Sequence, residues 1–395
     1  MGATAEPSSR RTLAAAFVAA VLSVIPVFLL GGVAVLVREE LSFSESRLGL
    51  CIAAYYVVSA LSAVPGGHVT ERLGGLRACG VGVLISVTAL LGISVLAHSW
   101  WQLAACLMVG GLANALLQPA TNLALAHGIP QDHQGLAFGL KLANGPTATL
   151  LSGVSVSVIA TTVGWRWAFV AMACLAMAFF ALRPPQWRMD APYIPSATEA
   201  PDADVPTLAL MAVGCTFATA VSAALVGFYV ESAVASGLAV STAGWFLVAG
   251  SAVGTAARPG WGWLVDRRRS SAFGLIVLLL VVGAVAFALL GAPANPVVLF
   301  VATLLAFAAG WGWPGLLLFA VVRASPAGPG KATGIVIVGT SSGGMLGPSS
   351  FGFLVERVGY VVAWRVAAVA VLVGAACIGA GAHLMRRRRA AGGPT

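Results

Sequence analysis

Long apolar segments follow one another along almost the whole chain, and short polar or glycine-rich stretches separate them. A helix that crosses a bilayer needs about 20 mostly apolar residues, and these segments are of that length. The pattern therefore predicts an all-α membrane protein with twelve transmembrane helices, six in each half. The expected spans are 12–37, 47–66, 78–97, 101–126, 135–161 and 165–182, followed by 206–230, 241–262, 271–290, 296–322, 332–355 and 361–385.

One segment interrupts this pattern in the middle of the chain. Residues 183–205 contain five prolines and four acidic residues, a composition that favours a flexible linker. We expect an N-terminal six-helix bundle at 1–182, a cytoplasmic linker at 183–205 and a C-terminal six-helix bundle at 206–395. Such a linker would let two bundles move against each other, although an inert spacer would have the same composition.

Composition and charge agree with a membrane protein. The chain is 59% hydrophobic and 9% charged, with a mean hydropathy of +0.94, whereas a soluble domain has about 25% charged residues. With both termini in the cytoplasm, 15 of the 22 basic residues lie on the cytoplasmic side, 5 on the opposite side and 2 inside predicted helices. This bias is typical of short cytoplasmic loops. It accounts for the net charge of +9 without a nucleic-acid partner.

Residue usage indicates the kind of organism and argues against disulfides, metal sites and catalysis. Two lysines against twenty arginines, with abundant alanine, glycine and valine, are typical of a GC-rich bacterial genome. We therefore expect a multi-pass protein in the lipid bilayer of a bacterial cytoplasmic membrane. The six cysteines are scattered singly, so neither disulfides nor a metal site are expected. No nucleophile–base cluster or phosphate-binding loop is present, so we expect no enzyme, no catalytic residues and no cofactor.

The two halves of the chain share short motifs. Residues 67–72 read GHVTER and residues 262–267 read GWLVDR, an offset of 195, each after a long apolar segment. The pair Trp165-Arg166 recurs as Trp364-Arg365 at an offset of 199. Recurrence over half the chain indicates that it is built from two repeats.

The first motif resembles the cytoplasmic turn between the second and third helices of the major facilitator superfamily. Its second copy lies between the eighth and ninth predicted helices, as in that family. The resemblance implies a latch that stabilises the outward-open state, held weakly here because Glu71 replaces the usual aspartate and Gly75 a usual basic residue. Alternatively, the arginines only enforce topology. The residues that the resemblance assigns to the latch are Gly67, Glu71, Arg72, Gly74, Gly262, Asp266 and Arg267.

A second resemblance to this family lies in the fifth and eleventh predicted helices. Asn144-Gly145-Pro146 and Gly347-Pro348 resemble the glycine-proline motif of the helices that line the interface between its two halves. Glycine permits close helix packing, and proline introduces a kink. The resemblance assigns Gly145, Pro146, Gly347 and Pro348 to gating. It also implies a solute site between the halves, near the bilayer midplane.

Two charged residues lie inside the predicted helices. Lys141 and Arg258 are expected in the fifth and eighth helices, and no acidic residue lies deep in any predicted helix to neutralise them. An intramembrane charge costs about 2.5–3.5 kcal/mol on insertion scales and is by default a functional hypothesis. Two such cations favour binding of an anion. Alternatively, Arg258 reaches the cytoplasmic interface or pairs with Asp266, and the long stem of Lys141 reaches the cytoplasm.

Uncharged polar and aromatic residues complete the candidate site. The substrate-binding candidates besides the two cations are Tyr55, Asn114, Asn144 and Trp313. Asn114 stands out because steps of four residues place it on one helix face with Gln118 and Asn122. Each of these side chains has an alternative role as a hydrogen-bonding contact between helices, which contributes about 0.6 kcal/mol.

The resemblance and the two cations together lead to one leading functional hypothesis. It is a monomeric secondary transporter that moves a small organic or inorganic anion, inward, by alternating access. The first alternative is an exporter of drugs or secondary metabolites. Against it, the first helix lacks the acidic residue and the fourth the arginine that proton-coupled exporters of the family usually carry. A non-transporting membrane receptor or scaffold on the same fold is the other alternative.

Overall fold

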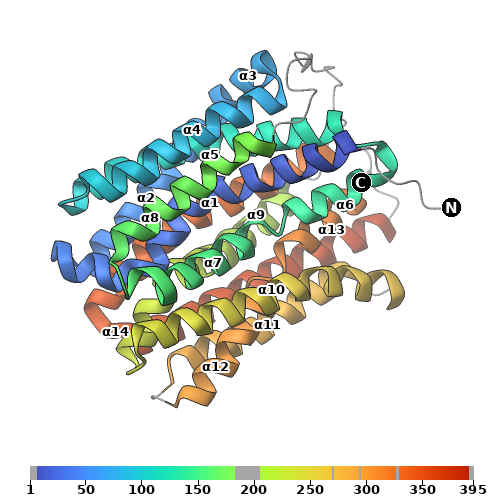
Figure 1. Cartoon of the computed structure of the whole chain (residues 1–395). Helices are drawn as coiled ribbons and strands as arrows, with labels where there is room; N and C mark the ends of the chain where they lie inside the picture. Colours follow the sequence, from blue (N-terminus) through green and yellow to red (C-terminus); the bar gives the residue numbers. More distant parts are fainter. Residues whose placement is uncertain (1–6, 183–204, 269–270, 293–294, 326–328, 391–395) are drawn as a thin grey trace. The chain divides into compact units, whose positions relative to one another are not determined.

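The computed structural model describes residues 7–182, 205–268, 271–292, 295–325 and 329–390 of the chain, and in these residues all regular structure is helical (Figure 1). The predicted linker at 183–205 lies outside them except for its last residue. The first half holds α1 (Pro7–Leu41), α2 (Glu45–Leu61), α3 (Ala63–Leu73), α4 (Gly75–Leu96), α5 (Trp100–Gly128), α6 (Gln131–Lys141), α7 (Asn144–Ser155) and α8 (Trp165–Met177). The second half holds α9 (Val205–Ala235), α10 (Val240–Arg268), α11 (Ala272–Leu290), α12 (Pro296–Leu305), α13 (Pro314–Ala324) and α14 (Pro329–Ala390).

The chain packs as two compact units. Unit one comprises Met1–Phe43 and Ala54–Ser196, and unit two comprises Ser44–Ala53 and Ala197–Thr395. Helix α2 therefore begins in unit two and continues in unit one. Apart from this short exchanged segment, each unit is formed from one half of the chain, and each is described below by itself.

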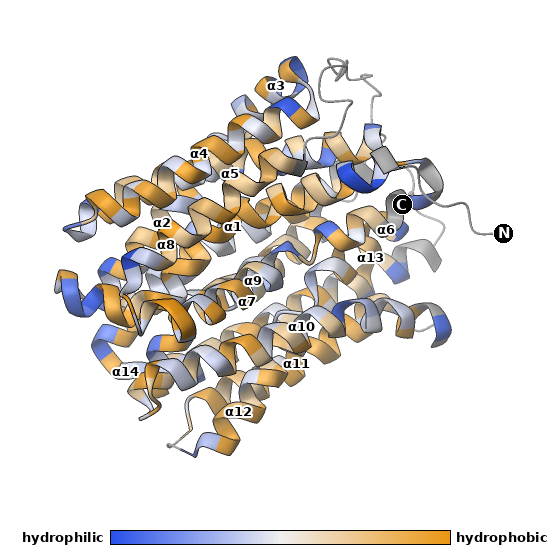
Figure 2. Cartoon of the chain, in the orientation of Figure 1, coloured by the Kyte–Doolittle hydropathy of each residue, from blue (hydrophilic) through white to orange (hydrophobic). Residues whose placement is uncertain are grey.

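The helices have the length and composition that a membrane requires. In the described residues, nine helices are long and apolar enough to span a bilayer, and the pair α2 and α3, bent by 54°, makes a tenth. A shorter apolar helix covers Trp165–Ala181. The longest span, Ala332–Arg387, contains Gly359 with φ 76° and ψ 169°, where two helices join at a kink. The twelve-helix count and the cytoplasmic position of the termini stay predictions. Figure 2 shows hydrophobic residues along the helices and hydrophilic residues gathered toward helix ends.

Helix α1 is the buried centre of unit one, and a proline shapes it. Pro26 has no amide hydrogen, so the carbonyl of Leu22 loses its helical donor. The hydroxyl of Ser86 on α4 donates to that carbonyl at 2.9 Å. On α5, Gly110 lies against Pro26, where a Cβ would meet the proline Cβ at 3.1 Å. Neighbouring helices thus satisfy the Leu22 carbonyl and pack against Pro26.

In unit two, three glycines at four-residue spacing bring α14 against α9. They are Gly339, Gly343 and Gly347, and a Cβ on each would collide with the backbone of α9. Small residues at this spacing let two membrane helices approach until their backbones touch. This close approach fixes the first part of α14 beside α9.

Two predicted spans are interrupted along their length. The fifth divides into α6 and α7 at Leu142 and Ala143, four residues before Pro146. The tenth divides into α12, a π-helical turn η4 (Ala306–Gly310) and α13, which begins at Pro314. Breaks of this kind free main-chain carbonyls that other groups must satisfy. The predicted site residues Lys141 and Trp313 lie at these two breaks.

Candidate functional site

The polar residues of unit one meet around the main chain of α1 beside Pro26. The Ser23 carbonyl accepts a hydrogen bond from the Tyr55 hydroxyl at 2.5 Å and one from Asn114 Nδ2 at 3.3 Å. Tyr55 is fully buried. Three helices, α1, α2 and α5, are therefore joined at a single carbonyl oxygen.

Further hydrogen bonds extend this network to two more predicted residues. Gln118 Nε2 donates to the Ser23 hydroxyl at 3.3 Å, and that hydroxyl donates to the Ala20 carbonyl at 2.7 Å. The side chain of Asn144, at the start of α7, donates to the same Ala20 carbonyl at 3.1 Å. The hydroxyl of Ser59 donates to Asn114 Oδ1 at 2.7 Å. The network thus reaches from α2 across α1 to the break between α6 and α7.

Lys141 lies next to this network as the last residue of α6. Its side chain is 6% exposed, and its ammonium donates to the Gln118 carbonyl at 3.2 Å and to Asn122 Oδ1 at 2.5 Å. Both acceptors are neutral oxygens of α5. Within the described residues no carboxylate forms an ion pair with Lys141. An ammonium has three donors, so one N–H of Lys141 has no hydrogen-bond acceptor among the described residues.

The structure therefore connects four of the predicted substrate-binding residues within unit one: Tyr55, Asn114, Lys141 and Asn144. Sequence reasoning did not identify Ser23 as the centre of the network, nor Ser59 as a member. The signal was Pro26, because a proline in a membrane helix marks the place where side chains bond freed or weakened backbone carbonyls. The expected common face of Asn114, Gln118 and Asn122 is present, since the first two contact Ser23 and the third contacts Lys141.

Arg258, the second predicted cation, lies in unit two and bonds the main chain at the broken helix. Its Nη2 donates to the Trp311 carbonyl at 3.0 Å, and its guanidinium lies 5.1 Å from the centre of the Trp311 ring. The indole N–H of Trp261, also on α10, donates to the Ala308 carbonyl at 2.9 Å. Two side chains of α10 thus satisfy carbonyls at the end of η4. The alternative partner Asp266 has a side chain outside the described part of the structure.

Trp313 is fully buried at the start of α13. Its indole N–H finds no acceptor among the described residues. A buried donor without a partner costs about 1–3 kcal/mol. This N–H is therefore an unsatisfied buried donor in unit two.

The residues assigned to the latch lie at a helix end in each unit. Gly74 ends α3 with φ 82° and ψ 159°, a backbone conformation that favours glycine. At Gly67 and Gly262 a Cβ would meet no described atom within 4 Å, whereas at Gly66 and Gly75 it would collide with the backbone of α5. Neither Glu71 nor Arg72 forms an ion pair with a described residue. Arg267 lies over the Trp263 ring at 5.0 Å.

The residues assigned to gating are all buried in their units. Gly145 and Pro146 lie in the first turn of α7, directly after the break that follows Lys141. Gly347 packs on the backbone of Ala220. A Cβ added to Gly347 would lie 2.5 Å from the Cα of Ala220. Pro348 lies inside α14.

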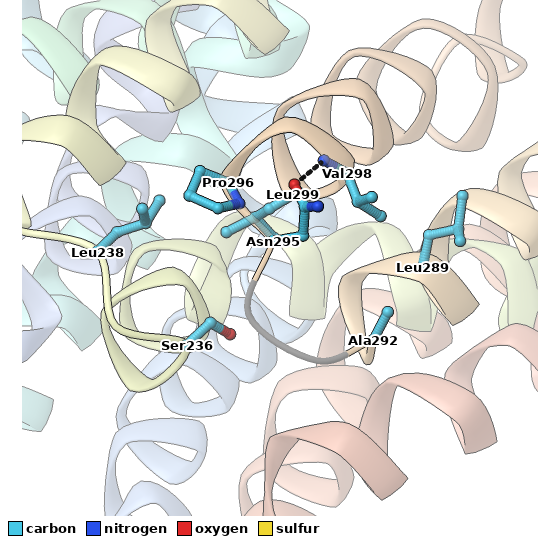
Figure 3. Close-up of a pocket in the computed structure, with 8 residues that line it drawn as sticks. All are labelled: Ser236, Leu238, Leu289, Ala292, Asn295, Pro296, Val298 and Leu299. Atoms are coloured by element: carbon cyan, nitrogen blue, oxygen red, sulfur yellow. Dashed lines mark hydrogen bonds between the residues drawn. The ribbon is translucent and has the colours of Figure 1, made fainter.

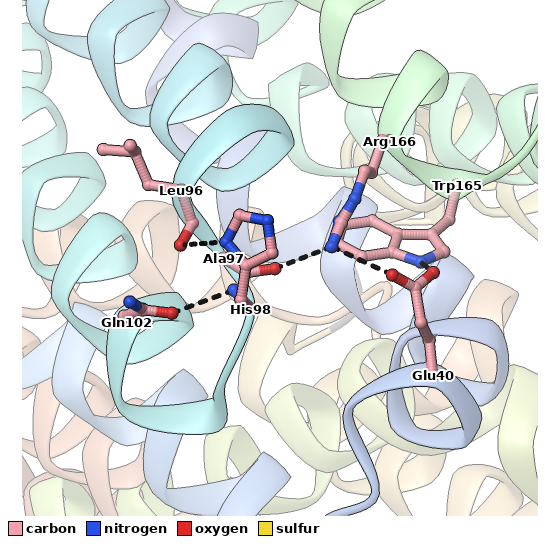
Figure 4. Close-up of polar contacts among 7 residues, drawn as sticks. All are labelled: Glu40, Leu96, Ala97, His98, Gln102, Trp165 and Arg166. Atoms are coloured by element: carbon pink, nitrogen blue, oxygen red, sulfur yellow. Dashed lines mark hydrogen bonds and ion pairs between the residues drawn. The ribbon is translucent and has the colours of Figure 1, made fainter.

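The duplicated Trp-Arg pair ties helix ends together. Arg166 forms an ion pair with Glu40 at 2.9 Å and donates to the Ala97 carbonyl at 2.9 Å, while the Trp165 indole donates to Glu40 at 2.6 Å (Figure 4). In unit two, the Trp364 indole donates to the Ser232 hydroxyl at 2.6 Å. Both tryptophans thus bond the end of the first long helix of their own half. This role is structural and leaves Arg166 engaged away from the polar network.

Unit two contains a small hollow and a larger groove. The hollow, beside the start of α12, has a volume of about 10 Å³, enough for about one water. There Asn295 accepts hydrogen bonds from the amides of Val297 and of Val298, and Figure 3 shows the second of these. The groove, of about 310 Å³, lies between α9 and the two parts of α14. Its lining is apolar except for Thr216 and Ser350. Among the described residues, no group of three or more His, Cys, Asp or Glu side chains could hold a metal ion.

Comparisons with known proteins agree with this architecture. The chain is 27% identical over 350 residues to a chloramphenicol resistance protein of Streptomyces lividans, covering 84% of this chain and 87% of that protein. It is 24% identical over 151 residues to a probable sulfoacetate transporter of Cupriavidus necator, which covers 37% of this chain and 34% of the relative.

A solved structure has the same fold. It is an inward-facing bacterial homologue of the human lysosomal transporter Spinster, with a TM-score of 0.72, 17% identity and coverage of 97% of this chain and 98% of that one. The model of the Major Facilitator Superfamily matches residues 16–208 and 211–394. The chain is a multi-pass integral membrane protein and belongs to the Major Facilitator Superfamily of transporters.

Proposed function

We propose that this transporter moves a small organic or inorganic anion across the bacterial cytoplasmic membrane by alternating access, with Lys141 as the charge partner of the solute. The observation that carries the proposal is the surroundings of the Lys141 ammonium. It is buried, and its two hydrogen-bond partners are neutral oxygens of Gln118 and Asn122.

Neutral partners satisfy hydrogen bonds but leave the charge in place. Burial of a charge is costly unless an opposite charge or strong hydrogen bonds compensate for it. A carboxylate, sulfonate or phosphate would do both, because hydrogen bonds between an ammonium and an oxyanion are about twice as strong as neutral ones. The buried ammonium thus carries a cost that an anion removes on binding.

Unit two also has donors that suit an anion. The Trp313 indole N–H lacks an acceptor among described residues, and Arg258 supplies a guanidinium at the neighbouring break. We infer that Arg258 acts first as a support for the Trp311 carbonyl. The relative named as a sulfoacetate transporter supports an anionic substrate, although its match covers only part of either chain.

The experiment is a thermal-stability assay of the detergent-purified chain with three kinds of solute. Sulfoacetate, phosphate and propionate represent anions, chloramphenicol a neutral compound and tetraphenylphosphonium a lipophilic cation. A ligand at 100 times its Kd stabilises the native state by about 2.7 kcal/mol. We expect anions to raise the melting temperature of the parent, Lys141→Gln to lose this shift and Lys141→Arg to keep part of it. Lys331→Gln, which changes the other lysine of the chain, is the matched control.

A second candidate function is export of uncharged lipophilic compounds. The relative with the longer match is a chloramphenicol resistance protein, and the apolar groove of about 310 Å³ beside α9 is a site of suitable polarity. In that case chloramphenicol would stabilise the parent and Lys141→Gln equally. Cells that express either protein would also tolerate more of the compound than cells without it. That pair of results would replace the anion proposal.

A further inference from the structure

We propose that Asn122 determines which charge the solute carries. Its neutral amide holds the Lys141 ammonium in position without cancelling the charge, so that the site accepts an anion and discriminates against zwitterions and cations. This inference rests on the proposed function, since it concerns the same site. It adds a specificity-determining residue and a reason for the substrate class.

The contact geometry makes Asn122 the critical neighbour of Lys141. Asn122 Oδ1 is 2.5 Å from Lys141 Nζ, whereas the second acceptor, the Gln118 carbonyl, is 3.2 Å away. Gln118 contributes only its main chain to this contact, so no substitution there changes the charge of the acceptor. Position 122 is therefore the place on α5 where one atom decides whether the ammonium keeps its net charge.

The other end of the same amide faces outward as a donor. Because Oδ1 accepts from Lys141, the Nδ2 group points away, and no described residue accepts a hydrogen bond from it. Asn122 is exposed, while Lys141 is buried behind it. The ammonium and the amide NH₂ of its hydrogen-bond partner are both donors, and the oxygens of a carboxylate, sulfonate or phosphate accept from such groups.

Replacement of this amide by a carboxylate reverses both properties. In Asn122→Asp the oxygen near Lys141 becomes charged and forms an ion pair, and an acceptor oxygen replaces the NH₂ donor. An incoming anion then meets a like charge in place of a donor. This repulsion lowers the anion affinity more than the loss of one hydrogen bond does. A solute that brings its own ammonium would instead find a partner in the carboxylate that this variant introduces.

The test compares two solutes that differ in one charged group. Sulfoacetate carries a sulfonate and a carboxylate, whereas taurine carries a sulfonate and an ammonium. Their apparent affinities are measured from melting shifts of the full-length chain in detergent. The variants are Asn122→Asp and Asn122→Ala, with Lys141→Gln for comparison. Asn295→Asp is the matched control, because it makes the same chemical change at the cap of α12, where a carboxylate accepts the same two amide hydrogens.

We expect Asn122→Asp to weaken sulfoacetate binding by about a hundredfold and to gain taurine binding. Asn122→Ala should weaken sulfoacetate by about tenfold, because one donor is lost, and should keep the preference for the anion. Asn295→Asp should behave as the parent. The alanine variant keeps the test decisive if the aspartate variant does not fold.

Three results would overturn parts of the account in distinguishable ways. If Lys141→Gln loses sulfoacetate binding but both Asn122 variants bind it as the parent does, Asn122 has no role in selectivity and the proposed function stands. If both Asn122 variants lose binding equally and neither gains taurine, the residue is only a structural support, and the inference fails. If no anion stabilises the parent, or Lys141→Gln binds anions normally, the proposed function itself fails, and the inference fails with it.

Discussion

The hydroxyl of Tyr55 donates to the main-chain carbonyl of Ser23 at 2.5 Å, three residues before Pro26 inside α1. Asn114 donates to the same oxygen from α5. The Ser23 carbonyl thus accepts hydrogen bonds from two helices, α2 and α5. These bonds position the polar network next to Lys141. A single substitution at position 55 can remove one atom from this contact.

Tyr55→Phe should lower the stability of the folded chain by about 0.5–1.5 kcal/mol, the net value of one hydrogen bond. The loss stays modest because Asn114 continues to donate to the Ser23 carbonyl. Tyr56→Phe is the matched control, since the Tyr56 hydroxyl makes no hydrogen bond with a described residue. The measurement is the melting temperature in detergent, and equal effects of the two variants would contradict the role of Tyr55.

Arg258→Met should destabilise the chain by about 1–3 kcal/mol, because it removes the hydrogen bond that Arg258 donates to the Trp311 carbonyl and the contact of its guanidinium with the Trp311 ring. Arg258→Lys should recover part of this loss, since an ammonium can reach a carbonyl but cannot match the planar guanidinium over the Trp311 ring. Arg267→Met provides the comparison, because that guanidinium is exposed and lies over Trp263.

The measurement for Arg258 should include anion affinity as well as melting temperature. If Arg258 acts through the broken helix, Arg258→Lys changes stability more than it changes anion affinity. A variant that melts like the parent but no longer responds to anions would show that Arg258 contacts the solute directly.

Gly347→Ala should destabilise unit two by about 1–3 kcal/mol, the usual cost of overpacking. The added methyl would meet the Cα of Ala220 at 2.5 Å, and backbone atoms cannot move aside as a side-chain end can. Gly334→Ala, in the same helix, should be neutral or stabilising by about 0.5–1 kcal/mol, because no described atom lies within 4 Å of its new methyl. Equal melting temperatures for the two variants would contradict the packing of α14 on α9.

The sequence predicts those features of the fold that follow from the lengths of its apolar segments. Runs of about 20 apolar residues indicated the helices, and the repeated motif indicated the two halves. The breaks were harder to place: Leu142 and Ala143 are apolar and fit a continuous helix, so only Pro146 indicated that α6 ends there. The second predicted span ends at residue 66, but helical structure continues to Leu73. There α3 follows α2 after a bend of 54°.

The candidate site was predictable in its charges but not in its contacts. Lys141 was evident because a lysine in an apolar run is costly. Its partner, the Gln118 carbonyl, could not be predicted, because every residue has a main-chain carbonyl whatever its side chain. The same holds for the Ser23 carbonyl and for Trp311, which Arg258 bonds through the backbone. Contacts to the main chain depend on where a helix kinks, and that depends on packing.

The central claim is that the Lys141 ammonium binds an anion, and nitrogen-15 NMR of the lysine side chains tests it most directly. The chain has only two lysines, Lys141 and Lys331, so lysine-labelled protein gives two ammonium signals, and Lys331→Arg identifies the one from Lys141. We predict that titration with sulfoacetate, phosphate or propionate shifts the Lys141 signal to saturation and leaves the Lys331 signal unchanged. A Lys141 signal that no anion moves, in protein that is folded and melts cooperatively, would contradict the account.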